Sequence, residues 1–248
     1  MRILVVNPNT SVEMTASIDL VAQKYAGPNL EIVTVCPRYG PRSIEGHFEE
    51  QIAALATVET IAERLDDFDA FVIACYGDPA VDACREITEK PVIGIGEASM
   101  NLASLLGHKF SIVTVIPRAV PIMENLVRKV RLEGKCASVR ATSLSVLEIE
   151  ADPDRAVVEM VEQAKIAVRD DGAEVICLGC AGMGPLDERV EAAVGVPVID
   201  GTASAVLLAQ ALLLYGKKTS KAAAYAAPPE KELVDCSPIL RRLSGAKV

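Results

Sequence analysis

The chain has 248 residues, of which 50% are hydrophobic and 24% are charged, and this composition supports a substantial buried core. Its net charge of −9 and its 4% of aromatic residues argue against nucleic-acid and anionic-membrane partners, which need basic surfaces or stacking side chains. No apolar run reaches the roughly 18 residues of a membrane span. The first residues resemble a strand more than a signal peptide, so we expect a cytoplasmic protein whose seven cysteines stay reduced.

Apolar, β-branched runs alternate with helical patterns along the whole chain. The predicted strands cover Arg2–Val6, Leu30–Val35, Ala70–Cys75, Pro91–Ile95, Phe110–Val115, Ala137–Leu144, Val175–Cys180 and Pro197–Ile199. The clearest helices between them cover Ser11–Tyr25, Glu49–Leu65, Val120–Glu133, Pro153–Asp170 and Ala203–Tyr215. Strands of this uniform hydrophobicity are typical of parallel sheets covered by helices on both faces. The pattern predicts a doubly wound α/β fold.

Three strand-ending segments of the first half return in the second half at nearly one spacing. ILVVNPN resembles SIVTVIPR, AFVIACYGDP resembles AEVICLGCAGMGP, and PVIGIGEAS resembles PVIDGTAS. The repeat predicts two pseudosymmetric lobes, each with a mainly parallel four-stranded sheet flanked by helices, with the active site in the cleft between them. We expect residues 1–97 plus 203–248 to form the first α/β lobe and residues 98–202 to form the second.

Cys75 and Cys180 end matching strands of this repeat. Small residues follow each thiol, and then a proline suited to a first helical turn; Asp78 is the expected N-cap before Pro79. A helix N-terminus favours the thiolate, which lowers a pKa that starts near about 8.5, and its N–H groups can stabilise an oxyanion. Two such thiols on opposite faces of one acidic carbon would act as base and acid, and would invert a stereocentre without a cofactor.

Packing roles compete with this interpretation, because cysteine is among the most buried residue types. Cys177 and Cys180 also form a C-x-x-C pattern, which permits a redox or zinc interpretation. No second C-x-x-C pair or histidine cluster completes it, so we expect neither a metal nor a cofactor. Thr10 and Glu13 fit a capping box for the first helix, which we interpret as structural.

Five segments together resemble hydantoin and allantoin racemases of the aspartate/glutamate racemase superfamily. They are NPNTS, GPRSIEG, ACYGDP, GCAGM and PVIDGTASAV, spread over residues 1–215. The resemblance implies an isomerase, a cofactor-independent racemase of a 5-substituted hydantoin or of allantoin, with Cys75 and Cys180 as the catalytic pair acting at C5.

The resemblance and the strand-end positions together suggest which residues bind the substrate: Asn9, Ser43, Tyr76, Gly77, Thr114, Ile116, Ala181 and Gly182. Asn9 and Ser43 would face the ring, Thr114 and Ile116 would line the opposite wall by the repeat, and the other four would offer backbone N–H groups to the substrate carbonyls. Each side chain has a structural alternative: a turn for Asn9, a loop cap for Ser43, and core packing for the opposite wall.

Other functions stay open. The chain has CYG and CAG where amino-acid racemases of the superfamily typically carry a threonine soon after each cysteine, which argues against a free amino acid. Maleate isomerases keep two cysteines, malonate decarboxylases keep one, and a non-catalytic two-lobe binding protein is the alternative outside enzymes. We expect a small cyclic ureide as the ligand and a homo-oligomer. The sequence leaves the preferred ring, the preferred enantiomer, the subunit number and the role of the C-terminal tail undetermined.

Overall fold

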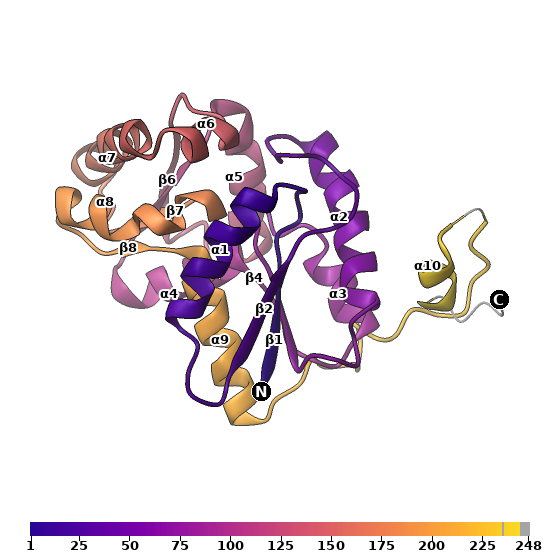
Figure 1. Ribbon diagram of the computed structural model, residues 1–248. Helices are drawn as coiled ribbons and strands as arrows, with labels where there is room; N and C mark the ends of the chain where they lie inside the picture. Colours follow the sequence, from indigo (N-terminus) through magenta and orange to yellow (C-terminus); the bar gives the residue numbers. More distant parts are fainter. Residues whose placement is uncertain (235, 244–248) are drawn as a thin grey trace.

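Two parallel four-stranded sheets form the frame of the computed structural model, which describes residues 1–234 and 236–243 (Figure 1). The first sheet has the order β2-β1-β3-β4, with β1 (Arg2–Val6), β2 (Glu31–Val35), β3 (Ala70–Ile73) and β4 (Val92–Gly94). The second has the order β6-β5-β7-β8, with β5 (Phe110–Thr114), β6 (Cys136–Ala141), β7 (Val175–Leu178) and β8 (Val198–Ile199). The predicted fold class, with two four-stranded α/β sheets, is confirmed.

Helices flank both sheets (Figure 1). The first half contains α1 (Val12–Lys24), α2 (His47–Ala62), α3 (Val81–Ile87) and α4 (Ile95–Leu106). The second half contains the 3₁₀ turn η1 (Pro117–Ala119), α5 (Val120–Lys129), α6 (Val146–Ala151), α7 (Pro153–Asp170), the 3₁₀ segment η2 (Ala181–Leu186) and α8 (Asp187–Val194). After β8 come α9 (Gly201–Tyr215) and α10 (Pro238–Leu243).

The central strands make the core. All residues of β3, β5 and β7 are buried, as are Ile3 to Val6 of β1, whereas β6 at the sheet edge is only half-buried. Full burial of each Val or Ile side chain stabilises the fold by roughly 1.5–3 kcal/mol. Because these strands are covered on both faces, the chemistry must sit at their carboxyl ends, where the loops reach the surface.

Two helices join the sheets. α4 leaves β4 and packs against β5, β7 and β8, while α9 leaves β8 and returns to pack on α4, α1, β3 and β4. The two helices therefore lie side by side between the sheets (Figure 1). Their closest approach needs a glycine, because a Cβ built on Gly201 would lie 2.9 Å from the Ile95 carbonyl oxygen. These crossings support the division at residues 98 and 203, which stays a prediction.

The chain after α9 runs along the outer side of the first sheet's helices. The Tyr225 hydroxyl donates to Asp82 at 2.9 Å, and α10 contacts α2. Within the part of the chain that the structure describes, no helix combines the length and the hydrophobicity needed to cross a membrane.

Candidate active site

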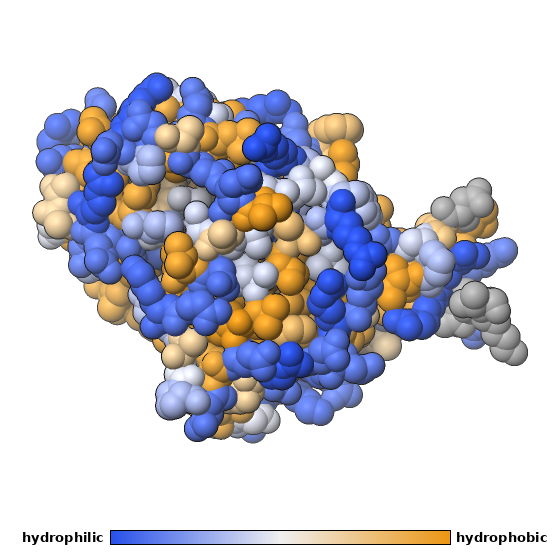
Figure 2. Space-filling model, in the orientation of Figure 1, coloured by the Kyte–Doolittle hydropathy of each residue, from blue (hydrophilic) through white to orange (hydrophobic). Residues whose placement is uncertain are grey.

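A cavity lies at the carboxyl ends of the two sheets, where β3 and β7 lead into Cys75 and Cys180. Six predicted site residues line it: Asn9, Cys75, Tyr76, Gly77, Cys180 and Ala181. Both cysteines are half-buried residues and neither is in a disulfide. On the face shown in Figure 2, hydrophobic residues and residues of intermediate hydropathy occupy the middle, and hydrophilic residues surround them. The structure thus brings the two repeated cysteines to one cavity from the two sheets.

The loop after Cys75 differs from its prediction. α3 begins at Val81 and Ala80 holds its N-cap position, so the expected N-cap role of Asp78 for this helix is wrong. Asp78 and Ala80 both have left-handed backbone conformations, with φ of 51° and 67°, which turn the chain before α3 can start. The Asp78 carboxylate points elsewhere and accepts hydrogen bonds from the Gly96 and Glu97 N–H groups of α4 at 2.8 and 2.7 Å.

The loop after Cys180 is a helical turn. Cys180 is the N-cap residue of η2, and the Met183 N–H donates to its carbonyl oxygen at 3.0 Å. Pro185 lies inside η2, and α8 starts two residues later at Asp187. Only this thiol therefore begins a helical segment directly.

Burial dominates the acidity of both thiols. It raises the pKa of Cys180 to about 11 and raises the pKa of Cys75 further above its ordinary value. The Gly77 N–H lowers the pKa of Cys75, and the Gly182 and Met183 N–H groups lower the pKa of Cys180, but neither effect offsets burial. The expected net lowering of the two pKa values is therefore wrong.

Asn9 and Thr114 have structural partners. The Asn9 side-chain oxygen accepts from the Asn7 amide at 2.8 Å and from the Ser11 N–H at 2.9 Å, while its amide nitrogen lies 3.1 Å from the Met14 sulfur. Asn9 thus shapes its turn and also lines the cavity. The buried Thr114 hydroxyl donates to the Gly179 carbonyl at 3.1 Å, beside Cys180.

The remaining predicted residues lie near the cavity but do not line it. Ile116 packs on the core, and its neighbour Val115 lines the wall instead. Ser43 is half-buried in the 41–46 loop, whose Ile44 reaches the cavity. A Cβ built on Gly182 would lie 3.8 Å from the Cys180 sulfur and 3.5 Å from the Met14 methyl carbon, so this glycine is adjacent to both the thiol and the cavity wall.

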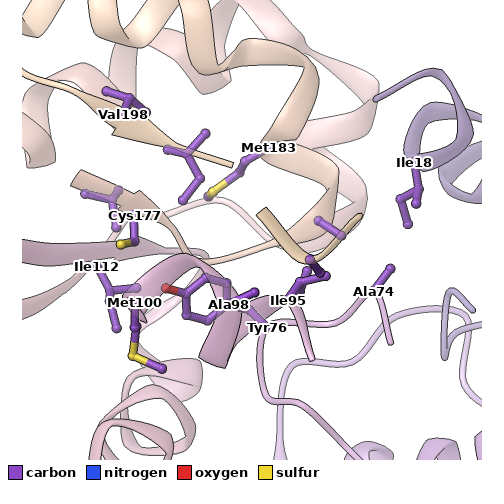
Figure 3. Close-up of a cluster of buried hydrophobic side chains, with 14 of the residues drawn as sticks. Ile18, Ala74, Tyr76, Ile95, Ala98, Met100, Ile112, Cys177, Met183 and Val198 are labelled. Carbon is purple, nitrogen blue, oxygen red and sulfur yellow. The ribbon is translucent and has the colours of Figure 1, made fainter. Parts of the chain in front are cut away.

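Tyr76 contributes backbone to the cavity and its ring to the core. The ring is 1% exposed and lies among Ala98, Met100 and Cys177 (Figure 3). The Ser99 hydroxyl donates to the Tyr76 hydroxyl oxygen at 2.9 Å. This buried contact anchors the residue that follows Cys75 to α4.

The sequence interpretation missed one carboxyl group and an apolar wall. Glu50 of α2 lines the cavity beside Gly77, where a Cβ would lie 2.6 Å from Glu50 Oε1, and His47 Nδ1 lies 3.4 Å from Glu50 Oε2. Burial raises the pKa of Glu50. The apolar wall consists of Met14, Ile44, Val115, Ile122, Met123 and Val146. The helix of Glu50 was predicted, but no local pattern indicated which of its faces meets the cavity.

The 41–46 loop bridges the two lobes over the cavity. Glu45 Oε1 accepts from the Val146 N–H at the start of α6 at 2.8 Å, and the Pro41 carbonyl accepts from the Thr10 N–H at 3.0 Å. A Cβ on Gly46 would lie 2.6 Å from the Arg118 guanidinium.

Among the residues with described positions, no group of three or more His, Cys, Asp or Glu side chains is placed to hold a metal ion.

The chain is similar to known racemases over almost its whole length. The family model described as Asp/Glu/Hydantoin racemase matches residues 3–209. A hydantoin racemase of Pseudomonas sp. (strain NS671) is 43% identical, with 94% of each chain covered, and a hydantoin racemase of Paenarthrobacter aurescens is 40% identical, with 94% of this chain and 99% of that one covered. The solved structure of an allantoin racemase from Klebsiella pneumoniae is 41% identical, covers 98% of each chain and superposes with a TM-score of 0.92. The chain therefore belongs to the Asp/Glu/Hydantoin racemase family and is an isomerase.

Proposed function

We propose that this protein is a cofactor-independent racemase that inverts C5 of a 5-substituted hydantoin or of allantoin, with Cys75 and Cys180 as a two-base pair. The observation that carries the proposal is that two thiols at equivalent strand ends reach one cavity from two similar sheets. The names of the relatives, hydantoin racemase and allantoin racemase, support the substrate class.

The reaction removes a proton from one face of the ring and delivers a different proton to the opposite face. The thiolate of one cysteine takes the proton from C5, the C–H electron pair passes into the adjacent carbonyl as an enolate, and the thiol of the other cysteine returns a proton to the opposite face. Backbone N–H groups at Gly77 and Gly182 stabilise whichever sulfur is charged, and the roles exchange in the reverse direction. Such N–H groups need no reorganisation during the reaction.

The other substrate-binding residues support this reaction in different ways. Asn9, Tyr76, Gly77 and Ala181 line the cavity and are the direct contacts of the proposal. Thr114 holds the carbonyl of Gly179, the residue before Cys180. Ile116, Ser43 and Gly182 do not line the cavity but lie next to residues that do, and they are the more distant substrate-binding residues of the proposal.

We further propose that the enzyme works in the cytoplasm as a homo-oligomer, with no nucleic-acid or membrane partner. Seven free cysteines fit a reducing compartment. Size-exclusion chromatography with light scattering measures the number of subunits, and a monomer at all concentrations contradicts the homo-oligomer.

The test is deuterium exchange at C5 of each separate enantiomer of allantoin and of a small panel of 5-substituted hydantoins. Wild-type protein in D₂O should exchange and racemise both enantiomers. Cys75→Ser should still exchange the enantiomer whose C–H faces Cys180 while its inversion falls by roughly 10²–10⁴-fold. Cys180→Ser should do the same with the other enantiomer.

Two results would sink the proposal. Near-native racemisation of both enantiomers by either serine variant would exclude the two-base assignment. Absence of exchange and of optical-rotation loss with every substrate would favour a binding protein or another activity of the fold. Thermal denaturation of each variant serves as the control that the chain still folds.

A further inference from the structure

Each lobe holds one buried aspartate between its cysteine loop and the helix that follows the last strand of its sheet. In the first lobe this aspartate belongs to the cysteine loop, and in the second lobe it belongs to the start of the helix. Asp78 precedes the proline of the first cysteine loop, and Gly184 holds the same place in the second. Gly94 ends β4, and Asp200 holds the same place after β8. Asp78 with Gly94 in one lobe thus becomes Gly184 with Asp200 in the other.

In the first lobe the carboxylate belongs to the cysteine loop. The side chain of Asp78 is buried and accepts hydrogen bonds from the N–H groups of Gly96 and Glu97, the second and third residues of α4. The N-cap residue of α4 is Gly94, which has no side chain to accept them. A Cβ built on Gly94 would overlap the Asp78 carboxyl group. Asp78 therefore supplies, from the cysteine loop, the cap that α4 lacks.

In the second lobe the carboxylate belongs to the helix. Asp200 is the N-cap residue of α9 and its Oδ1 accepts from the Ala203 N–H at 2.7 Å. Its Oδ2 is buried and, within residues 1–234 and 236–243, has no hydrogen-bond partner. This oxygen faces the cysteine loop, because a Cβ on Gly184 would lie 2.5 Å from it.

Capping alone does not account for this arrangement. A helix cap requires no glycine in a neighbouring loop, yet each carboxyl group fills the space that a Cβ would need on the facing glycine. Asp78 also holds a left-handed backbone at φ 51°, a conformation that aspartate adopts more readily than most residues other than glycine. The carboxyl group thus sets the spacing between the cysteine loop and the helix in both lobes.

We propose that Asp78 and Asp200 are positioning residues, each of which joins the loop of one thiol to the helix after the fourth strand and so sets where Cys75 and Cys180 stand in the cavity. The inference deepens the proposed function and rests on it for the role of the two thiols. Asp78 acts on the Cys75 side through hydrogen bonds, and Asp200 acts on the Cys180 side through packing against Gly184.

The first test exchanges the two partners within the first lobe. Asp78→Gly should slow C5 exchange about tenfold or more for the enantiomer that faces Cys75, and less than about threefold for the other. The double variant D78G/G94D rebuilds the arrangement of the second lobe and should restore the slowed exchange to within about threefold of wild type. The single variant G94D keeps Asp78, and it should not exchange this enantiomer at the wild-type rate, because two carboxyl groups would compete for one space.

The matched control is Asp152→Gly. Asp152 is also an N-cap residue, of α7, and accepts from the Arg155 N–H at 3.1 Å, but it is exposed and outside the cavity lining. This variant should lower the melting temperature without favouring either enantiomer. If Asp78→Gly does not fold, Asp78→Asn should show a smaller loss on the same face, since its amide oxygen keeps one acceptor.

The second test needs no substrate, so it separates this inference from the proposed function. The ratio of iodoacetamide alkylation rates at Cys75 and Cys180, measured by peptide mass spectrometry, should change about fivefold or more in D78G. It should return to within about twofold of wild type in D78G/G94D and stay unchanged in D152G. A ratio unaffected by D78G, or not restored by the double variant, would overturn the inference. If the wild type exchanges no C5 proton at all, the proposed function fails, while the alkylation ratios still decide this inference.

Discussion

The two thiols are equivalent by position but not by environment. Cys180 starts η2 and receives two backbone N–H groups, whereas Cys75 receives one and lies near the carboxyl groups of Glu50 and Asp78. Burial raises both pKa values, but it raises that of Cys75 further. The two thiols therefore differ in acidity, and the pKa of Cys180 is the lower of the two.

We expect Cys180 to be the more nucleophilic thiol of the unliganded protein. Because its pKa is the lower of the two, iodoacetamide should modify it at least about tenfold faster than Cys75 at pH 8.5. Peptide mass spectrometry after short exposures measures both rates, and urea-unfolded protein, in which the two rates should converge, is the control. Equal rates in the folded protein would contradict the predicted difference in acidity between Cys75 and Cys180.

Asp200 should make the protein less stable as the pH rises. Burial raises its pKa from 3.8 to about 7, so between about pH 4 and pH 7 the folded state holds a proton that the unfolded state has lost. The free energy of unfolding contributed by this group then falls by roughly 1.4 kcal/mol per pH unit over that window and levels off above it.

Asp200→Asn removes this titration and keeps an N-cap side chain. The melting temperature of the variant relative to wild type should therefore rise from pH 5 to pH 8. Calorimetry across this range measures the difference, with Asp152→Asn at an exposed cap as the control. A difference independent of pH would show that Asp200 ionises normally in the folded state.

At the scale of elements, the 41–46 loop of the first lobe contacts the second lobe at the start of α6. It enters α2, which carries Glu50, and its Glu45 accepts the N–H of Val146, the first residue of α6. A hydrogen bond to a charged group contributes about 1.5–3 kcal/mol. The loop therefore couples two cavity walls that no sheet connects.

Glu45→Ala should weaken substrate binding more than catalysis. Loss of the hydrogen bond to α6 should raise KM about three- to tenfold, with kcat changed less than about threefold, because the cysteine loops are untouched. Steady-state kinetics with each enantiomer provides both constants. Arg42→Ala, an exposed residue of the same loop, should change KM less than about twofold. A fall in kcat with unchanged KM would place Glu45 in the chemistry instead.

The first helix shows how local caps shift by one residue. The capping box was predicted at Thr10 and Glu13, but Ser11 is the N-cap residue of α1 and accepts the Met14 N–H at 3.1 Å. Thr10 instead donates its N–H to the Pro41 carbonyl of the bridging loop. The local pattern favoured Thr10 as the N-cap residue, but Thr10 contacts that loop instead, and Ser11 caps the helix.

At the scale of the whole molecule, the sheets are joined in the centre and the tail is attached outside. The tail contacts α2, α3 and the Glu89–Lys90 turn, for example through the Thr219 N–H bond to the Glu89 carbonyl at 2.8 Å. In the described structure, the cavity lining includes no residue beyond Ala181. The tail should therefore stabilise the first lobe without affecting the reaction.

A chain that ends at Ala227 should keep the racemisation rate within about twofold and lose a few degrees of melting temperature. It retains the Tyr225–Asp82 hydrogen bond and removes α10 from α2. The comparison needs rates at equal protein concentration, together with light scattering. A rate loss of tenfold with the subunit number unchanged would contradict this reading of the tail.

Much of the frame follows from local pattern. Largely apolar runs located the eight strands to within a few residues, since a doubly covered strand needs apolar side chains on both faces; the half-buried edge strand β6 carries Ser138 and Arg140 among its apolar residues. The repeat placed Cys75 and Cys180 at matching strand ends, and the structure brings both to one cavity. The five clearest predicted helices all exist, and the helices expected at the prolines after each cysteine are α3 and α8, which begin two residues after Pro79 and Pro185; α4, α6 and α10 were not predicted.

The sequence by itself determined the sheets, the repeat and the two thiols, because hydrophobic periodicity and strand-end chemistry are local. Only the tertiary structure decided the acidity of the thiols, since desolvation depends on everything packed around them. It also decided which face of α2 brings Glu50 to the cavity. α4 shows the reason most directly: its N-cap residue, Gly94, has no side chain to accept the N–H groups of Gly96 and Glu97. Their acceptor is Asp78, a residue of the cysteine loop that only the fold brings to this helix.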